Sequence, residues 1–373
     1  QILQANNLKT PKYTMTSKDS PKNQSIKTFP AKSIQLLMAL IGLNLILFFA
    51  NLIFGSISIP FSEVLETLFL YSSSDESISS LIILSSRLPQ AITALLTGSA
   101  LSVAGLLMQT LFRNPLAGPG ILGISAGASM GVAIITLLGG ASSLVIISSY
   151  LQQFSIIIAA FLGAFSTLGL VLLFARFVKS NVSLLIIGLM IGYAVSSFIG
   201  FLQFISQDQQ VHSFVIWGLG SFSQVSMHQM ALFATLILSG IIASFFFVKP
   251  LNLMLLGEHY ATNLGVNVKK LRVSLIVIAG LLTAVATAYT GPIAFIGLAV
   301  PHLSRMIFKT SEHKILLPGI ILTGMAIALS CNLISRLPSL EQSIPINTVT
   351  SLFGAPLVIW FLIKNNRINM SSS

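Results

Sequence analysis

Charged residues are scarce in this chain of 373 residues, and their scarcity sets its class. Asp, Glu, Lys and Arg make up 8% of the sequence, against 54% hydrophobic residues, and the mean hydropathy is +0.91. Soluble globular proteins contain about 25% charged residues. Residues 114–175 and 273–304 contain no charged residue. Each segment is long enough for about two helices, since one membrane crossing needs roughly 20 apolar residues. The composition excludes a soluble domain.

Acidic residues are few as well, and all nine lie outside the segments that we expect to cross the membrane. Proton- and sodium-driven transporters usually need an ionisable or unwound site at mid-membrane depth. The sequence also lacks a GxxxxGK[ST] phosphate loop, so we do not expect it to hydrolyse ATP by that device. Energy for transport must then come from a partner. We predict no catalytic residue and no enzyme activity.

Cysteine and histidine clusters are missing too. The single cysteine, Cys331, excludes an intramolecular disulfide and a cysteine-rich metal site, and its apolar surroundings predict a packed small residue. His302 lies at the inner end of an expected span without a second ligand at metal spacing, so we interpret it as a structural or interfacial hydrogen-bonding residue. No metal site is predicted. We expect the other histidines in loops: His212, His228, His259 and His313.

Long apolar stretches, broken by Gly, Pro and charged residues, dominate the chain. They alternate too little and run too long for barrel strands, so we predict an all-α polytopic membrane protein. Residues 1–33 are expected to form a basic, disordered cytoplasmic tail, residues 34–367 a single transmembrane domain, and residues 368–373 a C-terminal tail. Because the chain begins with Gln, Met15 is a candidate translation start. The ten expected spans are 34–54, 89–111, 121–138, 154–175, 183–205, 229–248, 273–290, 293–308, 315–335 and 345–363.

Positive charge is distributed unevenly about these spans. Eighteen of the twenty Lys and Arg residues fall on one side, and only Arg87 and Arg336 fall on the other. Basic residues that flank short loops stay cytoplasmic, so this side and both termini are predicted to be cytoplasmic. The formal net charge of +11 therefore forms a rim at the span ends, and no nucleic-acid partner is expected.

Small residues recur at helical spacing in two places. Gly123, Gly127 and Gly131 form one small-xxx-small series, and Gly188 and Gly192 repeat the spacing. Such faces let helix backbones approach closely in a membrane. A tightly packed or moving helix pair and ordinary membrane packing both fit this pattern.

Pro89 is expected to begin a helix, since the N–H groups of a first helical turn have no intrahelical partner.

Residues 87–128 carry a specific series of motif residues. These residues are Arg87, Pro89, Gln109, Asn114, Pro115, Leu116, Ala117, Pro119, Gly123, Gly127 and Ala128. They match a pattern of R-x-P-R, a small-residue helix, a Gln, N-P-L-A-x-P and G-x-x-x-G-A. In this segment the sequence resembles the FecCD family of ABC importer permeases, which has this pattern and includes ferric-siderophore and vitamin B12 permeases.

The second half of the chain carries the same resemblance. Residues 256–266 are similar to the family's G-E-x-x-A-x-x-L-G segment. Residues 291–305, with Pro301, His302 and Arg305, are similar to its G-x-I-x-F-[IV]-G-L-x-x-P-H-x-x-R pattern. The resemblance runs from about residue 34 to residue 367.

The resemblance implies a type II ABC importer permease in a bacterial cytoplasmic membrane. The expected partners are a second copy or a homologous permease, two ATPase subunits and one substrate-binding protein on the outer face. ATP and magnesium would be bound by the ATPase, and no cofactor by this chain. The expected cargo is a ferric siderophore, with cobalamin and haem as alternatives. An ATP-independent secondary transporter is the alternative from a different class.

The resemblance also implies three sets of site residues. Arg87 and Arg336 would pair with glutamates of the binding protein, although arginines facing lipid headgroups are the competing interpretation. A coupling loop would dock on the ATPase, against a merely solvated loop, and a cytoplasmic gate would close the path, against a plain linker. The coupling residues are Gly257, Glu258, Ala261, Leu264, Gly265 and Val266. The gate residues are Asn114, Pro115, Leu116, Asn181 and Val182.

Three departures from the family pattern bear on docking. Gln90 replaces the second arginine of R-x-P-R, Asn332 stands where an aspartate is usual, and residues 343–347 replace the usual E-L-P-x-G. We therefore expect weaker or rearranged contacts with the binding protein, with Glu341 as a local substitute.

Overall fold

The computed structural model describes residues 31–55, 57–69, 77–138, 149–178, 180–336 and 343–370. Helices and short turns make up these ranges, and they contain no strand. Residues 1–30 of the predicted basic tail and Glu341 lie outside the described residues, whereas residues 31–33 already belong to α1 and residues 368–370 of the predicted C-terminal tail to α16. The helices are α1 (Ala31–Ile53), α2 (Phe61–Phe69), α3 (Ile78–Ile82), α4 (Leu88–Phe112), α5 (Ile124–Ala133), α7 (Ser149–Phe177), α8 (Asn181–Ile205), α9 (Asp208–Gly218), α10 (Met227–Phe245), α11 (Val248–Leu255), α12 (Glu258–Asn263), α13 (Val268–Thr290), α14 (Ile296–Phe308), α15 (His313–Ser335) and α16 (Ile346–Met370).

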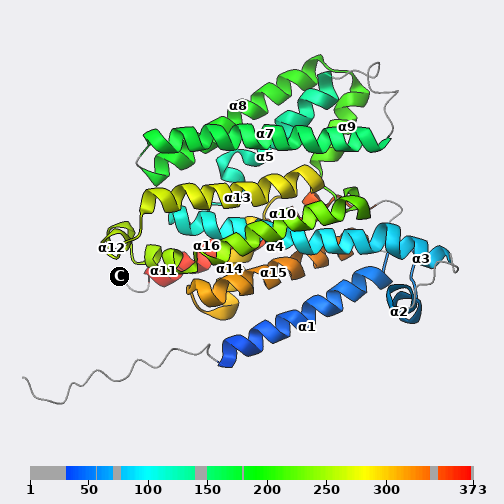
Figure 1. Cartoon of the computed structure of the whole chain (residues 1–373), viewed down its shortest axis with the longest axis horizontal. Coiled ribbons are helices and arrows are strands. Elements are labelled where there is room, and N and C mark those ends of the chain that lie inside the picture. The colour runs from blue at the N-terminus through cyan, green and yellow to red at the C-terminus, as the bar shows by residue number, and fades with distance from the viewer. Residues whose placement is uncertain are drawn as a thin grey trace, which may run out of the picture.

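The long helices form a bundle whose members run roughly side by side (Figure 1). Within the described residues, seven helical segments are long and apolar enough to cross a membrane. Three shorter apolar helices, Ile124–Leu138, Ile296–Phe308 and Ile346–Trp360, fall where the other expected spans were placed. The all-α class is therefore confirmed. The ten-span count and the cytoplasmic termini stay predictions, although α1 begins and α16 ends at the end of the bundle where α12 lies (Figure 1).

The second expected span is longer than predicted, because helix continues from Ile78 to Phe112. Pro89 therefore does not begin a helix but lies near the start of α4, directly after a π turn, Ile83–Arg87. A proline inside a helix lacks the N–H and crowds the carbonyl four residues earlier, which here belongs to Ser85. The wider π turn contains Ser85, so it relieves that crowding.

Helix α4 is the centre of the bundle and is almost wholly buried. It packs on α15 through Gly98 and Gly324, and on α14 through Gly105 and Gly297. A Cβ atom at Gly98 would lie 2.3 Å from the Gly324 carbonyl oxygen, and one at Gly105 would lie 1.7 Å from that of Gly297. Only glycine allows the backbones to approach so closely. Close packing of this kind holds helices together in lipid, where their association has no hydrophobic driving force.

A second tight pair joins α5 to α7. A Cβ atom at Gly127 would lie 2.5 Å from the Gly163 carbonyl oxygen, and one at Gly131 would lie 1.9 Å from that of Ala159. Gly188 of α8 approaches the turn before α5 in the same way, since a Cβ atom there would lie 2.8 Å from the carbonyl oxygen of Ile121. The small-residue series of the sequence is thus used for close helix packing.

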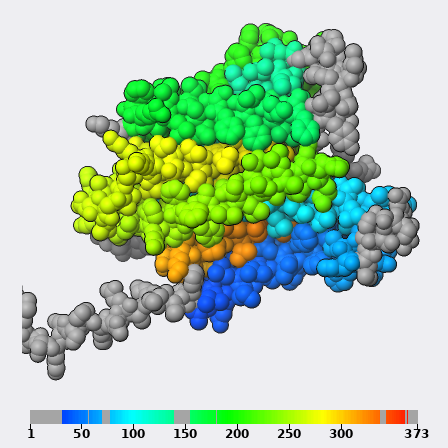
Figure 2. Space-filling view, viewed as in Figure 1, coloured from blue at the N-terminus to red at the C-terminus, as the bar shows by residue number. Residues whose placement is uncertain are grey.

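Helix α1 lies along the lower edge of the bundle (Figure 2) and buries little of its surface. Buried asparagines attach it to α15. The Nδ2 atoms of Asn44 and Asn51, one heptad apart, donate to the carbonyl oxygens of Leu322 and Leu329 at 3.0 and 3.1 Å. Asn332 donates to Oδ1 of Asn51 at 2.9 Å. Polar side chains hold helices together where lipid removes the hydrophobic drive.

Candidate functional site

We call the end of the bundle that the charge distribution predicts to lie outside the cytoplasm the outer end, and the opposite end the inner end. Arg87 lies beside the C-terminal end of α1, at the outer end, and is buried, with 3% of its surface exposed. Its Nη1 donates to the carbonyl oxygens of Leu52 and Ile53, both at 2.7 Å, and its Nη2 donates to that of Ile57. The last carbonyls of a helix have no intrahelical partner and attract cations. Arg87 therefore caps the C-terminal end of α1 and leaves little of its surface for either lipid headgroups or a partner.

Arg336 follows the last residue of α15 and reaches the same end of α1. It donates to Oε1 of Gln90 and, at 3.1 Å each, to the carbonyl oxygens of Asn51 and Phe54. Burial and then the neighbouring Arg87 cation lower the pKa of Arg336 to about 10, so it stays charged at neutral pH. Gly55 lies between the two guanidinium groups, because a Cβ atom there would lie 3.0 Å from Arg87 Nη2 and 3.2 Å from Arg336 Nη2.

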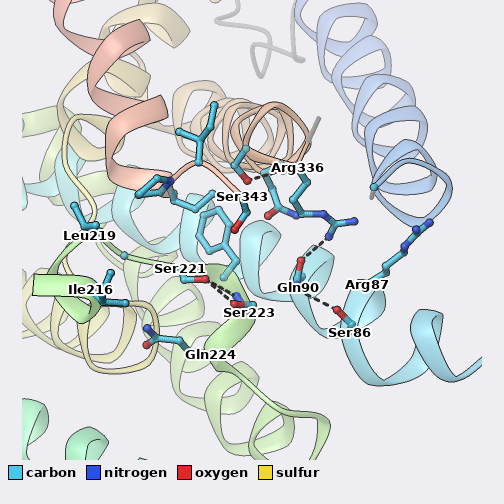
Figure 3. Close-up of a pocket in the computed structure, with 18 of the residues that line it drawn as sticks. Ser86, Arg87, Gln90, Ile216, Leu219, Ser221, Ser223, Gln224, Arg336 and Ser343 are labelled. Carbon is cyan, nitrogen blue, oxygen red and sulfur yellow. Dashed lines mark hydrogen bonds between the residues drawn. The ribbon is translucent and has the colours of Figure 1, made fainter. Parts of the chain in front are cut away.

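The two arginines line an outer cavity of about 830 Å³ between the ends of α4, α9, α15 and α16. Figure 3 shows Arg336 beside Gln90, and Arg87 directed toward the end of α1. Gln90 also donates to Oγ of Ser86 at 3.2 Å. Among the described residues, the other polar lining includes serines and amides but no Asp or Glu. The cavity is therefore cationic and rich in hydrogen-bonding groups.

The sequence thus predicted two separate outer cations, and the structure brings them into one site. Docking of a binding protein at Arg87 and Arg336 stays a prediction. Gln90, which stands where the family pattern has a second arginine, accepts a hydrogen bond from Arg336. Asn347, in the altered 343–347 segment, accepts a hydrogen bond from the Ala294 amide at 3.1 Å.

At the inner end, α4 stops at Arg113, whose backbone has a left-handed φ of 47°. The Leu116 amide then donates to Oδ1 of Asn114 at 2.9 Å, which closes a tight Asx turn. Among the predicted gate residues, Leu116 is 40% exposed and Val182 is 66% exposed. Leu116 is therefore exposed in the turn that follows α4, and Val182 is exposed in the first turn of α8.

A buried polar network supports this turn. His302 Nε2 lies 2.7 Å from the Pro115 carbonyl oxygen, and Arg305 donates to Oε1 of Gln109 at 2.6 Å. The hydrogen-bonding interpretation of His302 is thus confirmed. The prediction that the other four histidines lie in loops is wrong: His212 lies in α9, His228 in α10 and His259 in α12. His313 begins α15, where it is 1% exposed and forms a hydrogen bond with Thr110 at 3.0 Å.

The predicted coupling residues form a short helix, α12, and the turns on both sides of it. Gly257 has a φ of 113°, which favours glycine, and Ala261 is buried. Three large apolar side chains point away from the protein: Leu256 is 61%, Tyr260 67% and Leu264 61% exposed. Leu256 and Tyr260 are not among the residues predicted from the sequence, although apolar residues in a polar loop are a signal for a partner.

The structure also joins the predicted gate to the predicted coupling loop. Nδ2 of Asn181 donates to Oε1 of Glu258 at 2.6 Å and to the Leu111 carbonyl oxygen at 3.2 Å. These residues belong to three different helices, α8, α12 and α4. Sequence spacing carries no signal for this contact.

The model of the FecCD transport family matches residues 43–364, which is most of the chain. The chain belongs to the FecCD transport family.

Named relatives in this family are permeases of two importers. The chain is 35% identical to the hemin transport system permease protein HmuU of Yersinia pestis over 279 residues, covering 74% of this chain and 82% of HmuU. It is 35% identical to the vitamin B12 import system permease protein BtuC of Salmonella arizonae over 283 residues, 75% of this chain and 82% of BtuC. A solved metal-chelate type ABC transporter in an inward-facing conformation is 30% identical, with a TM-score of 0.77 and coverage of 89% of this chain and 99% of that one.

As a FecCD family member, the chain is a multi-pass membrane transport protein. The family motif residues fall at the two ends of α4 and at the elements that contact them. Arg87 lies at the outer end, and Gln109 and Asn114 lie at the inner end. Both ends of the most buried helix therefore carry the candidate sites.

Proposed function

We propose that this chain is the membrane-spanning permease subunit of a bacterial ATP-binding-cassette importer, located in the cytoplasmic membrane. It moves a metal chelate, delivered by a substrate-binding protein, and a separate ATPase supplies the energy. The family match over residues 43–364 carries this proposal. The chain itself is non-catalytic, and ATP and magnesium bind to the ATPase partner.

The inner face supplies the ATPase contact. Leu256, Tyr260 and Leu264 expose apolar surface beside a cationic rim, and buried Ala261 anchors α12 to the rest of the chain. Exposed apolar groups of this kind favour burial in a groove of a partner. Two ATPase subunits, one for each permease copy, would dock there.

The outer cavity supplies the contact with the binding protein. Arg336 is the more accessible of the two cations, and Gln90 already orients its guanidinium. A carboxylate of the binding protein can form a bidentate pair with such a group. Arg87 supports the site by holding the end of α1 and by adding positive charge.

A second copy of the chain would complete the transport path. Little of α8 is buried, and this helix begins at the gate residues Asn181 and Val182. A path past that gate runs along α8, so α8 would face the same helix region of the second copy across a two-fold axis. A homologous permease in place of the second copy would use the same face.

The cargo that we propose is a ferric siderophore, as predicted from the family resemblance. The relatives named above are a hemin and a vitamin B12 permease, so haem and cobalamin are the competing cargoes. The permease needs little affinity of its own, because no Asp, Glu, Lys or Arg lies within the described middle of α5, α7, α8 or α13. Selection would rest with the binding protein.

The test is reconstitution of the chain with its ATPase and binding protein in liposomes. ATP hydrolysis and uptake are measured with the binding protein loaded with a ferric siderophore, with haem or with cobalamin. We expect stimulation by the ferric siderophore and no uptake without the ATPase. Uptake that persists without the ATPase and collapses with an uncoupler would instead identify a secondary transporter.

A further inference from the structure

The side-chain amide of Asn181 joins α8, α12 and α4 at the inner end of the molecule. Asn181 begins α8, Glu258 begins α12, and Leu111 lies in the last turn of α4. Nδ2 of Asn181 bonds both of the other residues, at 2.6 and 3.2 Å. Its partners are 77 and 70 residues away along the chain. The contact is therefore made by the fold and not by local geometry.

The chemistry of the partners fixes the orientation of this amide. A carboxylate and a carbonyl both accept hydrogen bonds, so Asn181 must turn its NH₂ group toward them. A hydrogen bond to a carboxylate is shorter and about twice as strong as a neutral one, which agrees with the 2.6 Å separation. Among the described residues, this is the one hydrogen bond of the Glu258 carboxylate.

Neither helix needs this bond in order to form. Ser180 already caps α8, because its side chain accepts from the Ser183 amide at 3.4 Å. The first turn of α12 is closed by the Ala261 amide, which donates to the Gly257 carbonyl oxygen at 2.9 Å. Glu258 is also only half-buried, so water can solvate its carboxylate when Asn181 is removed, whereas Oδ1 of Asn181 is buried and has no hydrogen-bond partner among the described residues. Helix formation alone therefore does not account for this bond.

The position of the bond points to transmission of movement. On one side of it, α12 presents the exposed Tyr260 and Leu264 to a partner. On the other side, the next residue after Asn181 is Val182, which stands exposed at the gate. We propose that the Asn181–Glu258 pair is the link through which movement of ATPase-bound α12 reaches the gate at the start of α8. This role presupposes the permease function proposed above.

A single reporter thiol can follow this link without knowledge of the cargo. The sole native cysteine, Cys331, is 4% exposed, so we expect it not to react with aqueous thiol reagents. Val182→Cys places one reactive thiol at the gate. The reporter chain is reconstituted with its ATPase, and the rate of methanethiosulfonate labelling is measured without nucleotide and with Mg-ATP and vanadate. The ratio of the two rates measures how strongly the ATPase moves the gate.

We expect Asn181→Ala and Glu258→Ala each to reduce this ratio about tenfold, equivalent to about 1.4 kcal/mol of lost coupling. The double variant should lose no more than either single one, since both remove the same bond. ATP hydrolysis should continue, so the defect is uncoupling. Glu258→Gln keeps an acceptor oxygen and should retain most of the ratio. Ser183→Ala, in the same exposed turn of α8, should leave the ratio unchanged.

Three outcomes would overturn the link: an unchanged ratio in Asn181→Ala, multiplied losses in the double variant, or an equal loss in Glu258→Gln. Thermal unfolding of each purified complex separates uncoupling from misfolding. If Asn181→Ala does not assemble, Glu258→Ala tests the bond from its other side. A reporter that fails to respond to nucleotide in the unmutated background, or a chain that does not bind the ATPase, would instead refute the permease function itself.

Discussion

Replacing Arg87 by methionine removes the cap from the outer end of α1. Its guanidinium holds the carbonyl oxygens of Leu52 and Ile53 at 2.7 Å each, with a third bond to Ile57. Methionine is similar in length and apolar, so it can fill much of the space but donates nothing. The buried Leu52 carbonyl is then left without this partner, whereas the Ile53 carbonyl keeps the Ile59 amide, which donates to it at 3.1 Å.

The expected cost follows from these bonds. A buried polar group left unpaired costs about 1–3 kcal/mol, which applies to the Leu52 carbonyl. The Ile53 and Ile57 bonds are only partly buried, and the Ile53 carbonyl keeps the Ile59 amide, so these two bonds add little. Methionine also avoids the cost of burying a cation beside Arg336. We therefore expect a net loss of about 1–2 kcal/mol, concentrated in the last turn of α1.

Hydrogen exchange followed by mass spectrometry measures this loss locally. A loss of this size corresponds to roughly 5- to 30-fold faster exchange in the last turn of α1. The matched control is Arg113→Met, since Arg113 is exposed at the inner end of α4. Unchanged exchange at the end of α1 in Arg87→Met, or an equal change in Arg113→Met, would refute the capping role.

Three further predictions concern docking and packing. Arg336→Glu should lower the ATPase stimulation by the binding protein at least about tenfold, with partial recovery when an acidic residue of the partner is made basic; unchanged stimulation would remove Arg336 from the docking site. Gly105→Ala should prevent folding, because its Cβ atom would lie 1.7 Å from a carbonyl oxygen, whereas Gly42→Ala, with nothing within 4 Å, should give normal yield by size-exclusion chromatography. Asn51→Leu should lower the free energy of unfolding by about 1–3 kcal/mol in a denaturant titration, since the amide of Asn332 and the Leu329 carbonyl lose their hydrogen bonds to Asn51. An unchanged midpoint would show that these hydrogen bonds do not hold α1 on α15.

Much of the fold could be predicted because hydropathy is a local property. The ten expected spans coincide with apolar helices, and the motifs identified the family that the comparison then showed. The prediction was wrong where helix continued past a local signal. Pro89 indicated a helix start, but the π turn before it lets the helix extend back to Ile78. His313 read as a polar loop residue, but Asn252 and Thr110 satisfy its ring inside the protein.

The sequence by itself determined the class of the protein, the positions of its spans and the residue types at each candidate site. Free energies of transfer and helix-end chemistry act over one turn or one span, so they can be read along the chain. Only the tertiary structure brought Arg87 and Arg336 together around Gly55, and joined Asn181 to Glu258. Those pairings depend on which helix faces meet, and close approaches such as that of Gly98 to Gly324 decide which faces can meet.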